Sequence, residues 1–115
     1  MRSELLSVTG GTRPASLNDR AHLPYSWATM LEIQRVANII PQNIAKRTLA
    51  DVEIAGKLIP ADTLVQTQFY SVHRRGFSNG DEFLPERFLN DDGTTLRKEA
   101  VERLNPFGLG KRQCA

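Results

Sequence analysis

The residues best suited to chemistry surround the single cysteine of the chain, Cys114. The residues before it supply two glycines and the cations Lys111 and Arg112, in the sequence PFGLGKRQC. Positive charges beside a thiol lower its pKa and favour the thiolate, and glycines let backbone N–H groups approach the sulfur closely. A free cysteine is more often a small buried hydrophobe, but this context favours a thiolate that could bind a metal.

A second feature is a pair of opposite charges three residues apart, Glu32 and Arg35. This spacing places both side chains on one face of a helix. On a surface, such a pair contributes only about 0.3 kcal/mol. In an interior the two charges need a further partner, because their desolvation otherwise costs more than their attraction returns. Arg87, in the sequence PERF, is a candidate for that third member.

The element that must position the pair is a helix predicted over residues 23–40. Pro24 suits the first position of a helix, Pro41 ends the pattern, and apolar residues recur at helical spacing between them. The stripe that includes Trp27, Met30 and Leu31 is expected to pack in the core.

Ahead of this helix, residues 1–22 are rich in turn formers and predict a loop without a substantial core. Ser16 and Asp19 have the spacing of a capping box, which predicts one short helical turn. The two histidines, His22 and His73, show no metal-ligand spacing. We expect His22 to be a loop residue and His73 a residue at a helix end.

The rest of the chain predicts short elements. Residues 47–67 favour short antiparallel strands, since apolar and charged residues alternate and a Pro-Ala-Asp turn interrupts LIPADTLV. FYSVHRR predicts one helical turn. Residues 78–95 predict a loop, either ordered or disordered, and residues 96–103 predict another short helix. The fold class is therefore mainly α with a small antiparallel sheet (α+β). Such long irregular connections are uncommon in compact domains, which favours a piece of a larger fold.

Composition excludes several classes. The 115 residues are 40% hydrophobic and 24% charged, and the net charge of +2 is too small to indicate a nucleic-acid partner. Charges interrupt every 18-residue stretch and Glu4 breaks any early apolar run, so neither a membrane span nor an export signal is expected here. One cysteine excludes an internal disulfide, which fits a reducing compartment.

Together the motifs resemble the C-terminal part of the cytochrome P-450 family, the haem-thiolate monooxygenases, and most closely its microsomal, drug-metabolising animal type. The matching segments, in order, are LPYSWATMLEIQR, RTLADVEIAGKLIPADTLV, FYSVHR, PERFL and PFGLGKRQC. The resemblance implies a partial cytochrome P-450 domain. Its parts would be a loop with a short helix (1–22), the Glu-x-x-Arg helix (23–40), a β region (44–67), a meander (78–105) and the cysteine haem loop (106–115).

The resemblance also implies roles for residues of the cysteine loop. Cys114 would ligate haem iron, and Arg112 and, less strictly, Lys46 would pair with haem propionates. Phe107 would pack near the sulfur, and Gly110 would permit the tight turn.

Other implied roles are structural or concern the substrate. Glu32, Arg35 and Arg87 match the family's structural triad, which holds the meander and takes no part in catalysis. Ile40 and Ile44 would line the substrate side of the haem, with core packing as the competing interpretation. No catalytic residue is expected among these 115 residues.

For the whole protein, the resemblance implies insertion of one oxygen atom from O2 into a lipophilic substrate. Electrons would come from an NADPH-dependent flavoprotein reductase, for which the five cations and two acids of residues 97–112 offer a basic docking face or merely a solvated one. The expected place is the cytoplasmic face of the endoplasmic reticulum, with the mitochondrion as alternative and membrane association only through other segments. The alternative function is a truncated, noncatalytic product with weak or no haem binding that acts at most as a partner surface. Arg75 and Gly76 replace the family's usual acid and proline, which puts the local loop geometry in doubt.

Overall fold

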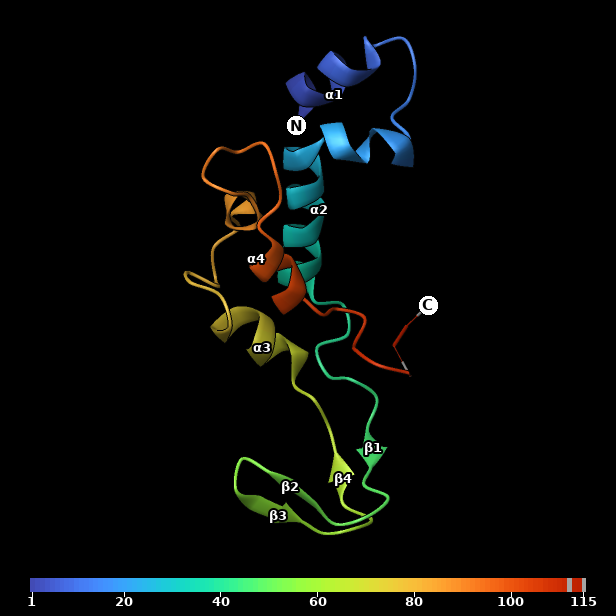
Figure 1. The fold of residues 1–115 in the computed structure, drawn as a ribbon, viewed down its shortest axis with the longest axis vertical. Coiled ribbons are helices and arrows are strands. Elements are labelled where there is room, and N and C mark those ends of the chain that lie inside the picture. Colours follow the sequence, from blue (N-terminus) through green and yellow to red (C-terminus); the bar gives the residue numbers. More distant parts are fainter. Residues whose placement is uncertain (112, 115) are drawn as a thin grey trace.

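The central element of the computed structural model, which describes residues 1–111, 113 and 114, is helix α2 (Pro24–Ala37) (Figure 1). Pro24 lies in its first turn, where the missing N–H of proline costs nothing. The helix ends three residues before the predicted end at residue 40. It stops because Asn38 adopts a left-handed conformation (φ 39°) and donates its N–H to the carbonyl of Gln34.

Two short helices precede α2. The 3-10 helix η1 (Leu17–His22) begins at Ser16 with the capping box that the sequence predicts, completed by Asp19. His22 is its last residue, so the expectation of a loop residue was wrong. Helix α1 (Arg2–Thr9) was not predicted. Its hydrophobic pattern is weak, and it is held through Glu4, which contacts the start of α2.

Within the described residues, four strands form two antiparallel pairs, as the alternation predicts. Strand β1 (Lys46–Arg47) pairs with β4 (Leu64–Val65), with Lys46 opposite Val65. Strand β2 (Val52–Ile54) pairs with β3 (Lys57–Ile59), with Glu53 opposite Leu58. The two residues between β2 and β3, Ala55 and Gly56, both have positive φ, which suits the twist of a tight hairpin.

The remaining helices are short and separated by irregular chain. They are α3 (Phe69–Arg75), the 3-10 helix η2 (Pro85–Phe88) and α4 (Lys98–Arg103). The prediction of an α+β fold, mainly helical with small antiparallel sheets, is confirmed. The chain is elongated, with extents of 58 × 28 × 21 Å, and the helices gather away from the protruding β2–β3 hairpin (Figure 1). Its radius of gyration of 18.0 Å exceeds the ~13 Å of a compact domain of this length.

The apolar core is small and lies between α2, η2 and α4. Its buried members are Ala28, Phe88, Leu89 and Leu104. The expected stripe on α2 is only partly in this core, since Leu31 packs against it but Met30 is 48% exposed. Among the described residues, no helix is both long and apolar enough to cross a membrane.

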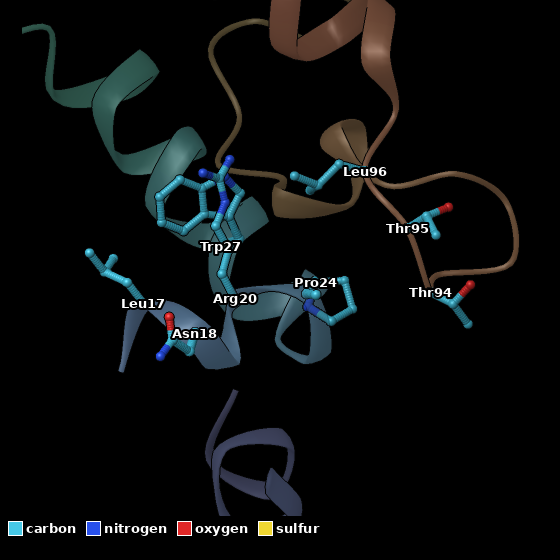
Figure 2. Close-up of a pocket in the computed structure, with 9 residues that line it drawn as sticks. Leu17, Asn18, Arg20, Pro24, Trp27, Thr94, Thr95 and Leu96 are labelled. Carbon is cyan, nitrogen blue, oxygen red and sulfur yellow. The ribbon is translucent and has the colours of Figure 1, made fainter. Parts of the chain in front are cut away.

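Trp27, the third residue of that stripe, lines a surface cavity instead of the core. The guanidinium carbon of Arg20 lies 3.9 Å from the centre of its ring, and Thr94, Thr95 and Leu96 line the other side of the cavity (Figure 2). A cation stacked on an indole is a favourable arrangement at a partly exposed site. Trp27 is half-buried and lies outside the apolar core that the described residues form.

Candidate functional site

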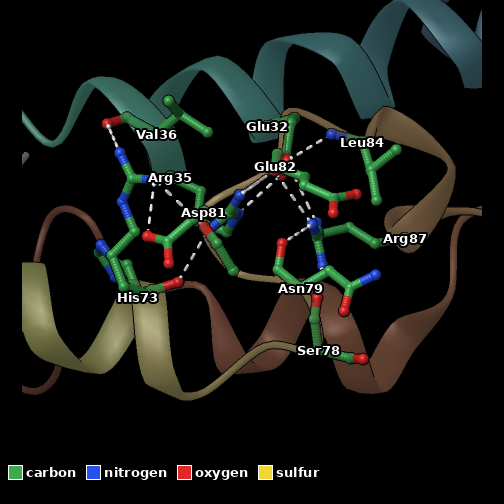
Figure 3. Close-up of polar contacts among 12 residues, drawn as sticks. Glu32, Arg35, Val36, His73, Ser78, Asn79, Asp81, Glu82, Leu84 and Arg87 are labelled. Carbon is green, nitrogen blue, oxygen red and sulfur yellow. Dashed lines mark hydrogen bonds and ion pairs between the residues drawn. The ribbon is translucent and has the colours of Figure 1, made fainter.

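A buried network of ion pairs and hydrogen bonds is centred on the carboxylate of Glu32 (Figure 3). Nε and Nη2 of Arg35 each donate to one oxygen of this carboxylate at 2.8 Å, and both side chains are fully buried. Arg87 Nε donates to Oε1 at 3.1 Å, and the backbone N–H of Leu84 donates to the same oxygen at 2.8 Å. Four donors therefore surround one buried acid.

The two guanidinium groups also hold an irregular segment of backbone. Arg35 donates to the carbonyls of residues 73, 80 and 82, at 2.9, 2.6 and 2.9 Å. Arg87 donates to the carbonyls of residues 78, 79 and 82. Residues 78–84 have no regular secondary structure, so their backbone acceptors need such partners.

Burial by itself raises the pKa of the Glu32 carboxyl group. The hydrogen bonds from Arg35 and Leu84, with the charges of Arg35 and Arg87, outweigh this effect, and the pKa of Glu32 lies below its ordinary value. Glu32 is consequently ionised at neutral pH. An anion paired with two cations is the arrangement that makes a buried charge tolerable.

The structure brings together Glu32, Arg35 and Arg87, and it adds two contributors that sequence reasoning missed. Arg74 donates to the carbonyls of Val36 and Gly80, at 3.4 and 3.3 Å. Gly80 lies so close to α3 that a Cβ would overlap the carbonyl oxygen of Arg74. A basic run such as His73-Arg74-Arg75 does not reveal which of its members turns inward.

A third missed contributor is Glu4, which caps the start of α2 from helix α1. Its two carboxylate oxygens accept the backbone N–H groups of Tyr25 and Ser26, each at 2.8 Å, and the Ser26 hydroxyl at 2.6 Å. The first N–H groups of a helix have no partner within it, and a carboxylate there also interacts favourably with the helix dipole. Glu4 thus fixes the end of the helix that carries Glu32 and Arg35.

The cysteine loop presents its thiol to solvent. The backbone N–H of Cys114 donates to the carbonyl of Phe107 at 2.9 Å, and the side chain is exposed. Gly108 and Gly110 have φ of 78° and 81°, a region that costs other residues strain, so these glycines form the turns that reverse the chain. Phe107 is 57% exposed. The predicted site residue Arg112 lies outside the described residues.

Two of the other predicted site residues share cavities with this loop. Lys46 and the loop residues Gly108 and Leu109 line one cavity of about 310 Å³. Ile40 and Phe107 line another of about 240 Å³. Ile40 is 63% exposed and Ile44 82%, so neither packs in the core that the described residues form.

Comparison with known proteins decides the family. A family model for cytochrome P-450 matches residues 1–115. The chain belongs to the cytochrome P-450 family. Human cytochrome P-450 2U1 is 37% identical over 116 residues, which cover 99% of this chain and 21% of that protein. Cat cytochrome P-450 1A2 is 40% identical over 116 residues, which cover 99% of this chain and 23% of that protein.

The family predicted from the motifs is thus confirmed, and the relatives named are animal proteins. This cytochrome P-450 chain spans about a fifth of the length of the curated relatives it matches.

The residues of this cytochrome P-450 chain fit the haem that the family implies. Haem is a flat, largely apolar macrocycle with two carboxylates, and it is held by an axial ligand such as a thiolate, by apolar contacts and by cations. The loop offers the exposed thiol of Cys114 and the exposed ring of Phe107, and Lys46 lies at the adjoining cavity. The donor set therefore matches the group in kind.

Proposed function

We propose that this chain forms the cysteine-loop part of a haem-dependent monooxygenase, with Cys114 as the thiolate ligand of the iron. The observation that carries the proposal is the exposed thiol at the end of a loop turned by Gly108 and Gly110. When bound, haem supplies the activation of O2 that a thiolate ligand favours by donating electron density. The residues around the haem would bind it and shield it from water.

In this proposal the neighbouring residues hold and shield the cofactor. Phe107 limits access of water to the sulfur, and Gly110 lets the backbone turn beneath it. Lys46 and Arg112 neutralise the haem carboxylates, and Arg112 does so with a fork that can donate two hydrogen bonds. Ile40 and Ile44 offer apolar surface to a lipophilic substrate.

The network of Glu32, Arg35 and Arg87 has a structural role in the proposed enzyme. It ties α2 to the irregular segment 78–84, which leads through η2 and α4 to the cysteine loop. We assign the parts of the partial domain accordingly: 1–22, the Glu-x-x-Arg helix 23–40, the β region 44–67, the meander 78–105 and the cysteine loop 106–115.

For the whole protein we propose that one oxygen atom of O2 enters a lipophilic substrate. The electrons would come from NADPH through a flavoprotein reductase, at the cytoplasmic face of the endoplasmic reticulum or, alternatively, in the mitochondrion. These proposals rest on membership of the family.

A second candidate function concerns the 115 residues by themselves. Such a chain would be noncatalytic, would bind haem weakly or not at all, and would act at most as a partner surface. The elongated shape and the exposed Phe107 and Leu109 favour this candidate.

A chimera tests the proposed function, with residues 1–115 replacing the matching 116 residues of human cytochrome P-450 2U1. We expect its reduced, carbon monoxide-bound form to show the red-shifted Soret band of thiolate ligation, and Cys114→Ala to abolish that band while Asp91→Ala leaves it intact. A band that survives Cys114→Ala removes the ligand assignment. Absence of haem from the chimera, with the band retained in the parent 2U1, favours the noncatalytic candidate.

A further inference from the structure

Ser78 is an exposed serine in the turn that follows helix α3. Its backbone carbonyl accepts a hydrogen bond from Arg87, and its side chain points away from the Glu32 network (Figure 3). None of the hydrogen bonds among the described residues involves its hydroxyl group. The hydroxyl is therefore available to accept a modifying group.

The residues before Ser78 carry a charge pattern that protein kinases recognise. Arg75 stands three positions ahead of the serine, in the sequence RRGFS, and it is exposed. Its neighbour Arg74 is paired with Asp81 at 3.4 Å, whereas Arg75 forms no ion pair with any described residue. A kinase selects its substrates by matching charges of its own to charges at a fixed distance from the hydroxyl. Arg75 is the charge that an acidic kinase subsite would bind.

The same spacing occurs at Arg13 and Ser16, where the structure argues against modification. The Ser16 hydroxyl is bonded to the carboxylate of Asp19 at 3.1 Å. Arg13 donates to both oxygens of that carboxylate, at 2.7 and 2.8 Å. The hydroxyl and the cation are both occupied, and a phosphate on Ser16 would be repelled by the neighbouring acid. The structure thus distinguishes two serines that the spacing alone makes equivalent.

Ser78 also lines a cavity of about 240 Å³ that is rich in cations. Arg87, Arg97 and Arg103 line it together with one acid, Glu99, so positive charge is in excess. A phosphate group on serine carries nearly two negative charges and three acceptor oxygens, and it is stabilised opposite a cluster of arginines. An anion attached to Ser78 would meet such a cluster already in place.

Two of these arginines can donate to a phosphate. Arg103 uses Nη1 for a backbone carbonyl, at 2.8 Å, and its other donors form no hydrogen bond with the described residues. Arg97 uses Nη2 for the exposed carboxylate of Asp91, at 3.0 Å. An exposed pair of this kind contributes little, so Arg97 can exchange Asp91 for a stronger anion. The donors of Arg87 are already used by Glu32 and by backbone carbonyls, so Arg87 adds only its charge.

We propose that Ser78 is a phosphorylation site for a protein kinase that recognises an arginine three residues before the serine. The Oγ of Ser78 attacks the γ-phosphorus of magnesium-bound ATP, the bond from that phosphorus to the departing ADP breaks, and the hydroxyl proton passes to a base of the kinase. The phosphate then accepts hydrogen bonds from Arg97 and Arg103 and joins segment 78–84 to α4. This inference is independent of the haem function, because no residue of the cysteine loop takes part.

Incubation of the purified chain with a calmodulin-dependent protein kinase and magnesium ATP tests the site, with peptide mass spectrometry as the measurement. We expect a phosphoryl group on Ser78 and little product at Ser16. Arg75→Gln should slow phosphorylation of Ser78 about tenfold, the size of a lost hydrogen bond between charged groups. The matched control is Arg47→Gln, which removes an exposed arginine paired with Asp62 and should leave the rate unchanged.

Three results of this experiment would overturn the proposal. Absence of phosphate from Ser78 would remove the site. Faster modification of Ser16 than of Ser78 would show that the contacts of Asp19 do not protect Ser16 and that the structure does not select between the two serines. An unchanged rate in Arg75→Gln would remove the recognition by arginine.

Titration of the phosphoserine tests whether Arg97 and Arg103 hold the phosphate. The second pKa of a phosphoserine is ordinarily about 6, and neighbouring guanidinium groups lower it because they favour the dianion. We expect phosphorus-31 NMR of the phosphorylated chain to give a pKa of about 5. The double variant Arg97→Gln, Arg103→Gln should return the pKa to about 6, and Arg47→Gln should leave it low. A pKa of about 6 in the phosphorylated wild-type chain would mean that the phosphate projects into water, and it would overturn the arginine site.

Discussion

Arg35 donates two parallel hydrogen bonds of 2.8 Å to Glu32, and both side chains are fully buried. The remaining acceptor capacity of the carboxylate is used by Arg87 and by the backbone of Leu84. The remaining donors of Arg35 reach three backbone carbonyls. These bonds link α2 to segment 78–84, about fifty residues later in the chain.

Glu32→Ala should be strongly destabilising, by about 3–5 kcal/mol, because it leaves two arginines in the interior without their anion. Domains are stable by only about 5–15 kcal/mol, and the small apolar core places this chain at the low end of that range or below it. The variant should therefore be largely unfolded at 25 °C. Circular dichroism and urea titration measure this. The matched control is Asp91→Ala, which removes an exposed ion pair with Arg97 and should change the urea midpoint little. Equal midpoints for the two variants would contradict the network's role.

Gly80→Ala should destabilise the chain more than Gly93→Ala. A Cβ at Gly80 would overlap the carbonyl of Arg74. A Cβ at Gly93 would meet no atom within 4 Å, so alanine there would be strained only by the positive φ of 68°. The control Gly93→Ala should therefore lower the free energy of unfolding by about 1 kcal/mol. Gly80→Ala should lower it clearly more and weaken the contacts of segment 78–84. Thermal unfolding of both variants decides between them, and a smaller loss for Gly80→Ala would mean that α3 does not pack closely on this segment.

Glu4→Ala should lower the free energy of unfolding by about 0.5–2 kcal/mol, the range for losing a helix cap. The backbone amides of Tyr25 and Ser26 lose their acceptors, so their hydrogen exchange should accelerate before that of amides in the middle of α2. The control Glu53→Ala removes an exposed carboxylate from β2 and should leave these amides unchanged. Unchanged exchange at Tyr25 and Ser26 in Glu4→Ala would show that the cap does not form in solution.

The stability of the chain should fall as the pH is lowered through the ordinary pKa of histidine, about 6.5. Burial and the charge of Arg35 keep the pKa of His73 below that value in the folded state. Between the two pKa values the unfolded chain binds more protons, so stability is complete above about pH 7.5 and is lost as the pH falls. Urea titrations from about pH 8 to about pH 5.5 measure the slope. His73→Phe should reduce this slope and His22→Leu should preserve it; a slope that persists in His73→Phe would assign it to other groups.

Several elements could be predicted because their causes are local. The capping box of Ser16 and Asp19 spans four residues, and the Pro-Ala-Asp turn and the β2–β3 hairpin depend on neighbours in the chain. Helix α1 could not be predicted, because its pattern is weak and its contact with α2 depends on Glu4 meeting amides 21 and 22 residues later. Residues 38–40 were also predicted as helical, but the left-handed conformation of Asn38 ends α2 at Ala37.

The sequence by itself determined the family, the cysteine loop and the three charged residues that could form a network, because motif spacing records which side chains share a helix face or a turn. Only the tertiary structure decided which of them are buried and what they touch. The carbonyls bound by Arg35, the inward turn of Arg74, the exposure of Ile40 and the burial of His73 all depend on segments far apart in the chain. Burial and hydrogen-bond partners are properties of how distant segments pack, and no local spacing encodes them.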